Sequence, residues 1–200
     1  MGPPALRADA ERNRCQLMTA ALAVFAERGL DAPLDEIARR AGVGNATLYR
    51  RFPTRCDLVA AVFAGTLREV IAAARHHLAY ADPWLGFRDH LSYLCELQAG
   101  NRAVADLIVS APGGRKELDQ LRAEALDGLT ALISRAQSGG ALRPDFRPAD
   151  VMLILMANAG LAERAGDTAP AATRRYLEYV LDGLHTPAGS LGRPVTPAAS

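Results

Sequence analysis

The chain has 200 residues, 50% of them hydrophobic and 6% aromatic, and its 23 basic side chains nearly balance 22 acidic ones. A net charge of +1 excludes a protein that attracts nucleic acid over its whole surface, so a nucleic-acid partner would require a local patch. Three widely spaced cysteines without a CxxC pair argue against a disulfide framework and a zinc cluster. The N-terminus lacks the apolar core of a signal peptide and no run reaches the roughly 20 apolar residues of a membrane span, so we expect a soluble, cytoplasmic protein.

Three helices are predicted in the first quarter of the chain. Apolar residues recur at helical spacing over 11–28, and Gly29 follows as a helix stop. The same spacing repeats over 34–41, a piece of about two turns that ends at Gly42. The third predicted helix is the segment GNATLYRRF, residues 44–52.

The second and third of these helices have the pattern of a helix-turn-helix. The small residue Ala38 allows two steeply crossing helices to touch, and Gly42 fits a turn whose φ angle is expected to be positive. Leu48 and Phe52, four residues apart, are expected to face the core. Such a unit leaves the outer face of its second helix free to enter the major groove of DNA.

The outward face of the third helix carries the candidate DNA contacts. At about 100° per residue, Ala46 and Arg50 point most directly away from Leu48. Small residues let the helix backbone approach base edges, and an arginine can reach a guanine or a phosphate. On an isolated segment, a solvated face of an ordinary short helix is an equally good interpretation. The candidate residues of this helix are Asn45, Ala46, Thr47, Tyr49, Arg50 and Arg51.

The rest of the chain also has helical patterns. Thr54 fits the cap of a long helix over 55–80. No strand pattern and no internal repeat is found, so we expect an all-α protein. Further helices are expected over 84–99, 102–110, 118–138, 149–164 and 171–185, before a tail over 187–200 whose composition is that of disorder.

Three segments between Arg14 and Leu58 carry a family resemblance: RCQLMTAALAVFAERG, LDEIARRAGV and ATLYRRFPTRCDL. In this order they resemble the DNA-binding domain of the TetR family of transcriptional regulators (TetR/AcrR-like). The resemblance implies that Thr47, Tyr49 and Arg51 contact DNA. It also implies a phosphate contact by Arg55, which stands where the family usually has a lysine. Positions that often contact DNA in the family are held here by Asn45, Ala46 and Arg50.

Three residues depart from the pattern of the resembled family. Pro33 replaces the usual threonine that caps the second helix and touches a phosphate, so we expect that contact to be absent. Arg51 replaces the commoner histidine, and Gly44 replaces the usual serine or another capping residue. These departures bear on the operator sequence rather than on the fold.

Local charge agrees with a DNA contact near the N-terminus. Through Arg55, nine arginines stand against six acids, a net charge of +3, so the remainder carries −2 given the total of +1. The basic excess therefore lies where a phosphate backbone would be.

The resemblance and the helix pattern together predict four segments. Residues 1–9 are expected to form a flexible N-terminus, and 10–54 a helix-turn-helix DNA-binding domain. Residues 55–186 are expected to form a larger helical bundle for ligand binding and dimerisation. A disordered tail is expected over 187–200.

An apolar helix favours dimerisation, which the resemblance also implies. The stretch VMLILMANAGLA is apolar nearly all round, and pairing with a second chain would cover it. The alternative is a helix central to its own subunit. The predicted dimer residues are Val151, Ile154, Leu155, Leu161, Tyr176, Leu177, Val180, Leu181 and Leu184.

Candidate ligand contacts are aromatic and polar residues on otherwise apolar faces, although such residues more often belong to the core. His76 and His77 diverge by about 100° on a helix, so a metal site built on both is not expected, and no cofactor is implied. The expected effector is a small apolar or aromatic molecule. The candidates are His76, Tyr80, Trp84, Phe87, His90, Tyr93, Cys95, Met152, Met156 and Asn158.

These features predict a homodimeric repressor that binds a palindromic operator and is released by a small-molecule effector. One alternative is a DNA-binding or architectural module that takes no ligand. Enzymatic activity is the other, but no paired carboxylates, nucleophile elbow, phosphate-binding glycine loop or HExxH motif is present, and no catalytic residue is proposed.

Overall fold

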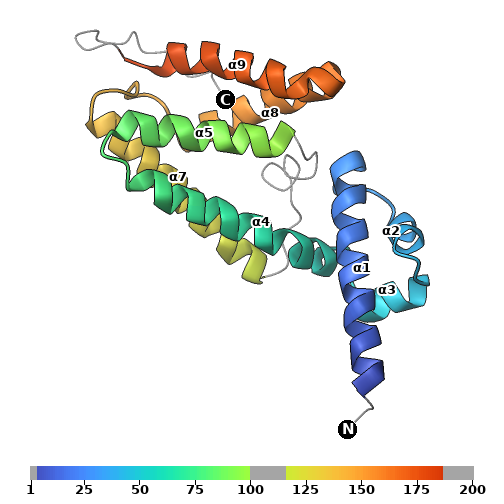
Figure 1. Cartoon of the computed structure of the whole chain (residues 1–200). Helices are drawn as coiled ribbons and strands as arrows, with labels where there is room; N and C mark the ends of the chain where they lie inside the picture. Colours follow the sequence, from blue (N-terminus) through green and yellow to red (C-terminus); the bar gives the residue numbers. More distant parts are fainter. Residues whose placement is uncertain (1–3, 100–115, 187–200) are drawn as a thin grey trace, which may run out of the picture. The chain divides into compact units, whose positions relative to one another are not determined.

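The computed structural model describes residues 4–99 and 116–186. Within them the chain is helical, which confirms the all-α prediction (Figure 1). The expected helix over 102–110 and the expected tail lie outside the described residues. The elements are α1 (Pro4–Arg28), α2 (Leu34–Arg40), α3 (Asn45–Arg51), α4 (Arg55–Leu78), α5 (Pro83–Ala99), α7 (Lys116–Ser138), α8 (Pro148–Ala165), the 3-10 turn η1 (Gly166–Thr168) and α9 (Ala169–Leu184).

The observed helix ends lie close to the predicted ones, except at the start of α1. This helix begins at Pro4, seven residues before the expected start at Glu11, so most of the expected flexible segment is helical. A proline at the first helical position and the alanines and arginine that follow favour this earlier start. Among the described residues, no helix is both long enough and apolar enough to cross a membrane.

The chain divides into two compact units, and the division falls within α4. Among the described residues, the N-terminal unit comprises 4–68 and 116–121, and the C-terminal unit comprises 69–99 and 122–186. The first half of α4 thus belongs to the N-terminal unit, whereas the pattern suggested a boundary before this helix. The reason is its apolar side: Phe63 packs on Phe25 of α1 with ring centroids 6.1 Å apart, and both side chains are fully buried.

The N-terminal unit is built around an apolar core. The short helix α2 packs against both the long helix α1 and the short helix α3, so the three helices enclose their hydrophobic faces together (Figure 1). Leu17, Ile37 and Leu48 contribute one buried side chain from each of the three helices, each 1% exposed or less. By area alone, full burial of such a side chain contributes about 1.5–3 kcal/mol.

The C-terminal unit combines apolar packing with a buried polar network. α5, α8 and α9 pack against one another. At their centre, the Asn158 amide donates hydrogen bonds to the Cys95 carbonyl and to Gln98 Oε1, each at 3.0 Å, and accepts one from the Thr173 hydroxyl at 2.8 Å. Asn158 is fully buried, so its bonds to two residues of α5 and one of α9 hold the three helices at a fixed register.

A second polar contact ties α7 to the end of α4 within the same unit. The Arg135 guanidinium donates to the carbonyl oxygens of Leu78 and Tyr80 at 2.8 and 2.6 Å. These carbonyls belong to the last turn of α4 and the residues after it, where helical acceptors lack partners. Arg135 therefore supplies a C-terminal cap from a different helix.

Candidate nucleic-acid interface

The turn between α2 and α3 has the geometry that the sequence predicts. Gly42 has φ +68°, a conformation that side chains with a Cβ rarely adopt, which confirms the expected positive φ. Its amide donates to the Arg39 carbonyl at 3.1 Å, and the Val43 amide donates to the Ala38 carbonyl at 3.0 Å. Ala38 is 1% exposed, as a close helix crossing requires.

The inner side of α3 anchors the helix. Leu48 and Phe52 are 1% and 5% exposed, which confirms their predicted inward orientation. After Pro53, the Thr54 hydroxyl accepts a hydrogen bond from the Asp57 amide at 3.1 Å, while Asp57 Oδ2 accepts one from the Thr54 amide at 3.0 Å. This reciprocal cap starts α4 with only three residues between it and the end of α3, so the short helix is fixed at both ends.

The outer side of α3 presents its polar and small residues to solvent. Asn45, Ala46, Tyr49, Arg50 and Arg51 are exposed. Thr47 is half-buried, nearer the margin of the face. These side chains are therefore accessible to a partner, as groove contact requires, and their DNA contacts stay a prediction.

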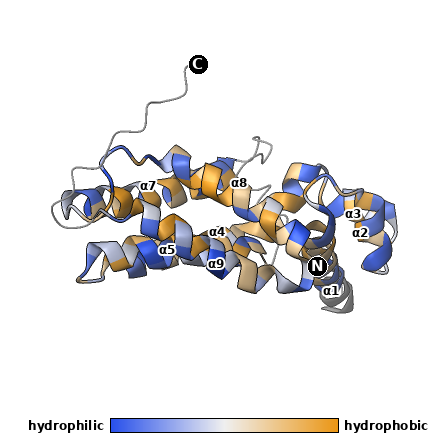
Figure 2. Ribbon diagram, turned by 90° about the horizontal axis from the view of Figure 1, so that it is seen from above, coloured by the Kyte–Doolittle hydropathy of each residue, from blue (hydrophilic) through white to orange (hydrophobic). Residues whose placement is uncertain are grey.

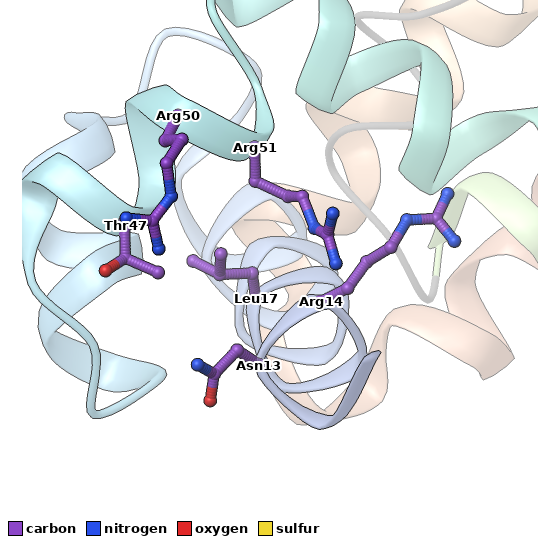
Figure 3. Close-up of a pocket in the computed structure, with 6 residues that line it drawn as sticks. All are labelled: Asn13, Arg14, Leu17, Thr47, Arg50 and Arg51. Atoms are coloured by element: carbon purple, nitrogen blue, oxygen red, sulfur yellow. The ribbon is translucent and has the colours of Figure 1, made fainter. Parts of the chain in front are cut away.

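Three α3 residues also line a pocket with residues of α1. Thr47, Arg50 and Arg51 meet side chains of the first helix around a hollow of about 210 Å³ (Figure 3). The α1 residues are Asn13, Arg14 and Leu17. Sequence reasoning missed Asn13 and Arg14. A signal was present, because both precede Leu17 by about one helical turn and so lie on the face of α1 that Leu17 buries.

Arg55 makes hydrogen bonds within the N-terminal unit, and its predicted phosphate contact stays a prediction. Its Nη1 donates hydrogen bonds to the carbonyl oxygens of Leu30 and Ala32, at 2.6 and 2.7 Å, and the residue is half-buried. This guanidinium ties the start of α4 to the loop between α1 and α2. We therefore treat Arg55 as a clamp of the N-terminal unit.

The arginines of α2 and the end of α1 are neutralised within the unit. Arg40 pairs with Glu27 at 2.7 Å, and this hydrogen-bonded arginine lowers the pKa of the Glu27 carboxyl. Arg28 pairs with Glu36 at 2.8 Å, and Arg39 lies 3.7 Å from the same carboxylate. Because these three arginines are paired with carboxylates, they add little positive potential at the surface. The arginines of α3 therefore contribute a larger share of the positive charge in this region.

Two family descriptions match the chain. Residues 17–62 match "Bacterial regulatory proteins, tetR family", and residues 82–186 match "Transcriptional regulator SbtR-like, C-terminal domain". The second match alone covers more than half of the chain. The chain belongs to the TetR family. It is thus a transcriptional regulator with an N-terminal helix-turn-helix, and not an enzyme.

Known TetR relatives resemble different shares of the chain. A TetR transcriptional regulator from Streptomyces coelicolor is 33% identical, covering 86% of this chain and 98% of its own, with a TM-score of 0.52. The HTH-type regulator SrpR of Pseudomonas putida is 43% identical over 58 residues, 28% of this chain and 27% of SrpR. The HTH-type activator FasR of Mycolicibacterium smegmatis is 38% identical over 69 residues, 34% of this chain and 32% of FasR. The matches thus span less than a third of these two curated relatives.

In this TetR protein, four of the predicted dimer residues are buried inside their own subunit. Each is at most 9% exposed within the single chain, because one side of α8 and of α9 packs on α5. A second chain cannot reach them, so the prediction is wrong for these four: Val151, Ile154, Leu155 and Leu177. The other five are half-buried: Leu161, Tyr176, Val180, Leu181 and Leu184.

The opposite side of α8 is exposed and largely apolar. Leu153 and Met156 are 63% and 54% exposed, and Ala157 and Gly160 extend this side along the helix. Figure 2 shows the hydrophobic colouring of the α8 ribbon. Sequence periodicity could not separate the two sides, because both are apolar.

Two of the predicted ligand contacts lie on the surface. His76 and Met156 are exposed, so neither lines a pocket inside the single subunit, and their predicted ligand contacts, that of Met156 on the dimer side, stay predictions. The other candidates are at least half-buried. Phe87, His90, Cys95 and Asn158 are buried, and Tyr80, Trp84, Tyr93 and Met152 are half-buried.

His90 is one of two candidates, with Cys95, whose pKa lies far from its ordinary value. It is 1% exposed, and burial together with nearby His77 lowers its pKa to about 4. Its Nδ1 lies 3.3 Å from His77 Nδ1, whose pKa burial and His76 also lower. Burial raises the pKa of Cys95 to about 12, so that thiol stays protonated and is a poor redox centre.

Proposed function

We propose that this regulator is a homodimeric repressor that binds a palindromic operator through α3 and is released by a small-molecule effector. The observation that carries the proposal is the orientation of α3. Leu48 and Phe52 hold one side in the core, and the opposite side offers small, hydroxyl and guanidinium groups to solvent. That is the division of labour of a recognition helix.

The residues of α3 divide into base contacts and phosphate contacts. Arg50 can donate a bidentate pair to a guanine, and Ala46 beside it lets the helix approach the base edges. Tyr49, Arg51 and Thr47 suit phosphates, which position the helix without reading sequence. Asn45 lies at the margin of the same face.

The DNA proposal is tested by selecting bound fragments from a genomic library with the purified protein. We expect one palindromic sequence to be enriched. Arg50→Ala should relax the preference at one position in each half-site, while Arg51→Ala should weaken binding to all sequences. If both variants lost the same affinity for the operator as for random duplex, Arg50 would not be a base contact. Absence of any enriched palindrome at low salt would contradict the proposal.

We propose that two chains pair through the exposed side of α8, and the composition of that side supports the proposal. One face of the helix is a contiguous apolar strip, because Leu153, Met156 and Gly160 are spaced three and four residues apart. Small residues on this face, such as Ala157 and Gly160, allow a second helix to approach closely. A two-fold dimer carries two α3 helices. Half-sites one helical turn apart, about 34–36 Å, would then match their separation.

A matched pair of substitutions tests the dimer. Met156→Arg places a charge on the proposed interface, and Leu126→Arg places one on α7, where the parent side chain is exposed to nearly the same extent, 53% against 54%. We expect sedimentation velocity to give a monomer for Met156→Arg and a dimer for Leu126→Arg. Dimers for both variants would assign the interface elsewhere.

The effector proposal rests on two buried nitrogen atoms of α5. Within the described residues, His90 Nε2 and Gln98 Nε2 have no hydrogen-bond partner. Buried polar atoms usually have one, so a ligand group that fills this role would be stabilised. We therefore propose a mostly apolar or aromatic effector with a polar group directed at α5.

Release follows from linkage between the two ligands. α4 contributes residues to both units, so a shift of this helix on effector binding would change the presentation of α3. The coupling should weaken DNA binding by about 5–150-fold, and DNA should weaken effector binding by the same factor. Titration of an apolar and aromatic compound panel against the operator complex tests this reciprocity. Binding of a compound without any change in DNA affinity would favour the ligand-independent alternative.

The sign of regulation needs a transcription assay. FasR is an activator, whereas repression is the outcome we propose for this chain. In a reporter assay, the operator between promoter elements should give lower transcription with the protein than without it. Higher transcription would make the protein an activator and leave the DNA proposal intact.

A further inference from the structure

The pocket between α1 and α3 has a chemistry of its own. Its floor is Leu17, which is fully buried, and its rim consists of side chains from the two helices (Figure 3). A hollow of about 210 Å³ has room for a tetrahedral oxyanion together with water. The pocket is therefore more than a groove between packed helices.

Its polar lining consists of donors. Arg14, Arg50 and Arg51 bring guanidinium groups, and Asn13 and Thr47 add an amide and a hydroxyl. None of the six lining residues is acidic. Guanidinium groups match phosphate oxygens in planar, bidentate geometry. The lining thus selects an oxyanion over a cation or an apolar group.

Charge balance within the unit leaves room for such an anion. Arg14 lies 3.8 Å from Glu11, and the two side chains are 42% and 63% exposed. An exposed pair at that distance contributes at most about 1 kcal/mol. An oxyanion between the two helices would therefore compete with Glu11 for Arg14 on favourable terms.

We propose that this pocket seats one phosphate of the DNA backbone, and that Asn13 and Arg14 of α1 are further DNA contacts. The inference rests on the proposed function, because the source of the phosphate is the duplex that lies against α3. Arg51, the α3 arginine assigned above to a phosphate, lines the pocket and belongs to that helix, while Arg50 beside it is left to the bases. A phosphate held by both α1 and α3 fixes the register of the recognition helix along the groove without reading any base.

The test is the salt dependence of DNA binding by the full-length protein. Each neutralised phosphate contributes about −0.9 to the slope of log K against log salt. We expect Arg14→Ala to make the slope shallower by about 0.9 and to weaken operator and random duplex alike, by about 5–10-fold at moderate salt. Arg14→Lys should keep the slope. Asn13→Ala should weaken binding less, because an amide carries no charge.

Arg28→Ala is the matched control. It removes one arginine from the same helix, fourteen residues further on, which is about 21 Å along the axis. Its slope should equal that of the wild-type protein. Thermal unfolding of each variant separates contact from folding: for Arg14→Ala we expect an unchanged midpoint together with the altered slope.

Several results would overturn the pocket proposal. An unchanged slope for Arg14→Ala, with a shallower one for Arg51→Ala, would remove α1 from the interface and leave the DNA function standing. A lowered unfolding midpoint with an unchanged slope would make Arg14 structural. Tight binding of inorganic phosphate without DNA, again with an unchanged slope, would assign the pocket to a free anion. A wild-type protein that binds no duplex would overturn both proposals.

Discussion

The two units of this TetR protein place their polar side chains in opposite ways. In the N-terminal unit the buried side chains are apolar, and the polar groups of α3 face outward. All four buried polar residues in the described part of the chain belong to the C-terminal unit: His90, Gln98, Asn158 and Thr173. The difference separates a unit that presents donors to an external partner from one that keeps polar groups inside.

This difference has a physical consequence for each unit. An apolar core has no hydrogen bonds to satisfy, so the N-terminal unit can hold a short helix such as α3 rigidly with few residues. A buried polar network is costly unless every member is paired. Where its members pair with one another, the network fixes the register of the helices; where a polar atom has no partner, a bound ligand can supply one. Loss of an apolar ring should harm the first unit most, and loss of a polar partner or a change of pH should harm the second.

Removal of an aromatic ring from the N-terminal core should have the largest effect. Phe63→Ala deletes the ring that packs on Phe25 and leaves a cavity between α4 and α1. We expect the free energy of unfolding to fall by about 3–5 kcal/mol. Denaturant unfolding measures it, with Leu126→Ala at an exposed site as control. A loss below about 1 kcal/mol would show that this core is loosely packed.

Acidification should destabilise the C-terminal unit through His90. Its pKa of about 4 in the folded protein lies below the unfolded value of about 6.5, so the unfolded state binds more protons between these values. Stability is therefore complete above pH 6.5 and declines as the pH falls toward 4, by up to about 3 kcal/mol. The contribution of His90 is the difference between the pH dependence of unfolding free energy in the wild-type protein and in His90→Gln. Carboxylates titrate in both proteins, so their contribution cancels. Parallel pH curves would place the His90 pKa near its ordinary value.

Removal of the network centre should have an intermediate effect. Asn158→Ala leaves the Thr173 hydroxyl and the Gln98 and Cys95 oxygens without their partner. We expect a loss of about 1–3 kcal/mol in denaturant unfolding. Asn45→Ala, at an exposed asparagine, serves as control and should change stability by less than about 0.5 kcal/mol. Similar values for the two variants would mean that the network adds no stability.

The smallest effect should be a gain. Gly65 lies within α4, in the half that belongs to the N-terminal unit, and a Cβ there would meet no atom within 4 Å. Alanine is a better helix former than glycine, so Gly65→Ala should raise the free energy of unfolding by about 0.5–1 kcal/mol. DNA affinity should stay the same. A loss of stability would point to a neighbour that occupies this side of the helix.

The same contrast explains how much the sequence could predict. The helix-turn-helix is a local motif, so spacing alone located the turn at Gly42 and the inward and outward sides of α3. The role of Arg55 was not readable, because its acceptors are backbone carbonyls 23 and 25 residues away. Asn13 and Arg14 share the Leu17 side of α1, which the spacing does indicate, but the α3 residues that complete their pocket come together only after the helices pack.

In the C-terminal unit the sequence predicted helices better than it predicted surfaces. α8 is apolar on both sides, so periodicity could not tell that Val151 is buried while Leu153 is exposed. His76 and His90 are both histidines within amphipathic helices, yet one is exposed and the other buried. The network around Asn158 joins three helices, and the periodicity of residues within one helix does not indicate hydrogen-bond partners on another.

Charge reversal on α3 tests the central claim most directly. The probe is a labelled duplex that carries the sequence enriched by the wild-type protein, and fluorescence anisotropy measures its affinity for each variant. The test variant is Arg50→Glu, and the control is Arg174→Glu, a charge reversal at an exposed arginine of α9. We predict about a 100-fold loss for Arg50→Glu, equivalent to roughly 3 kcal/mol, and a change below about twofold for Arg174→Glu. Equal affinities for the two variants would contradict the claim that the outer side of α3 binds DNA.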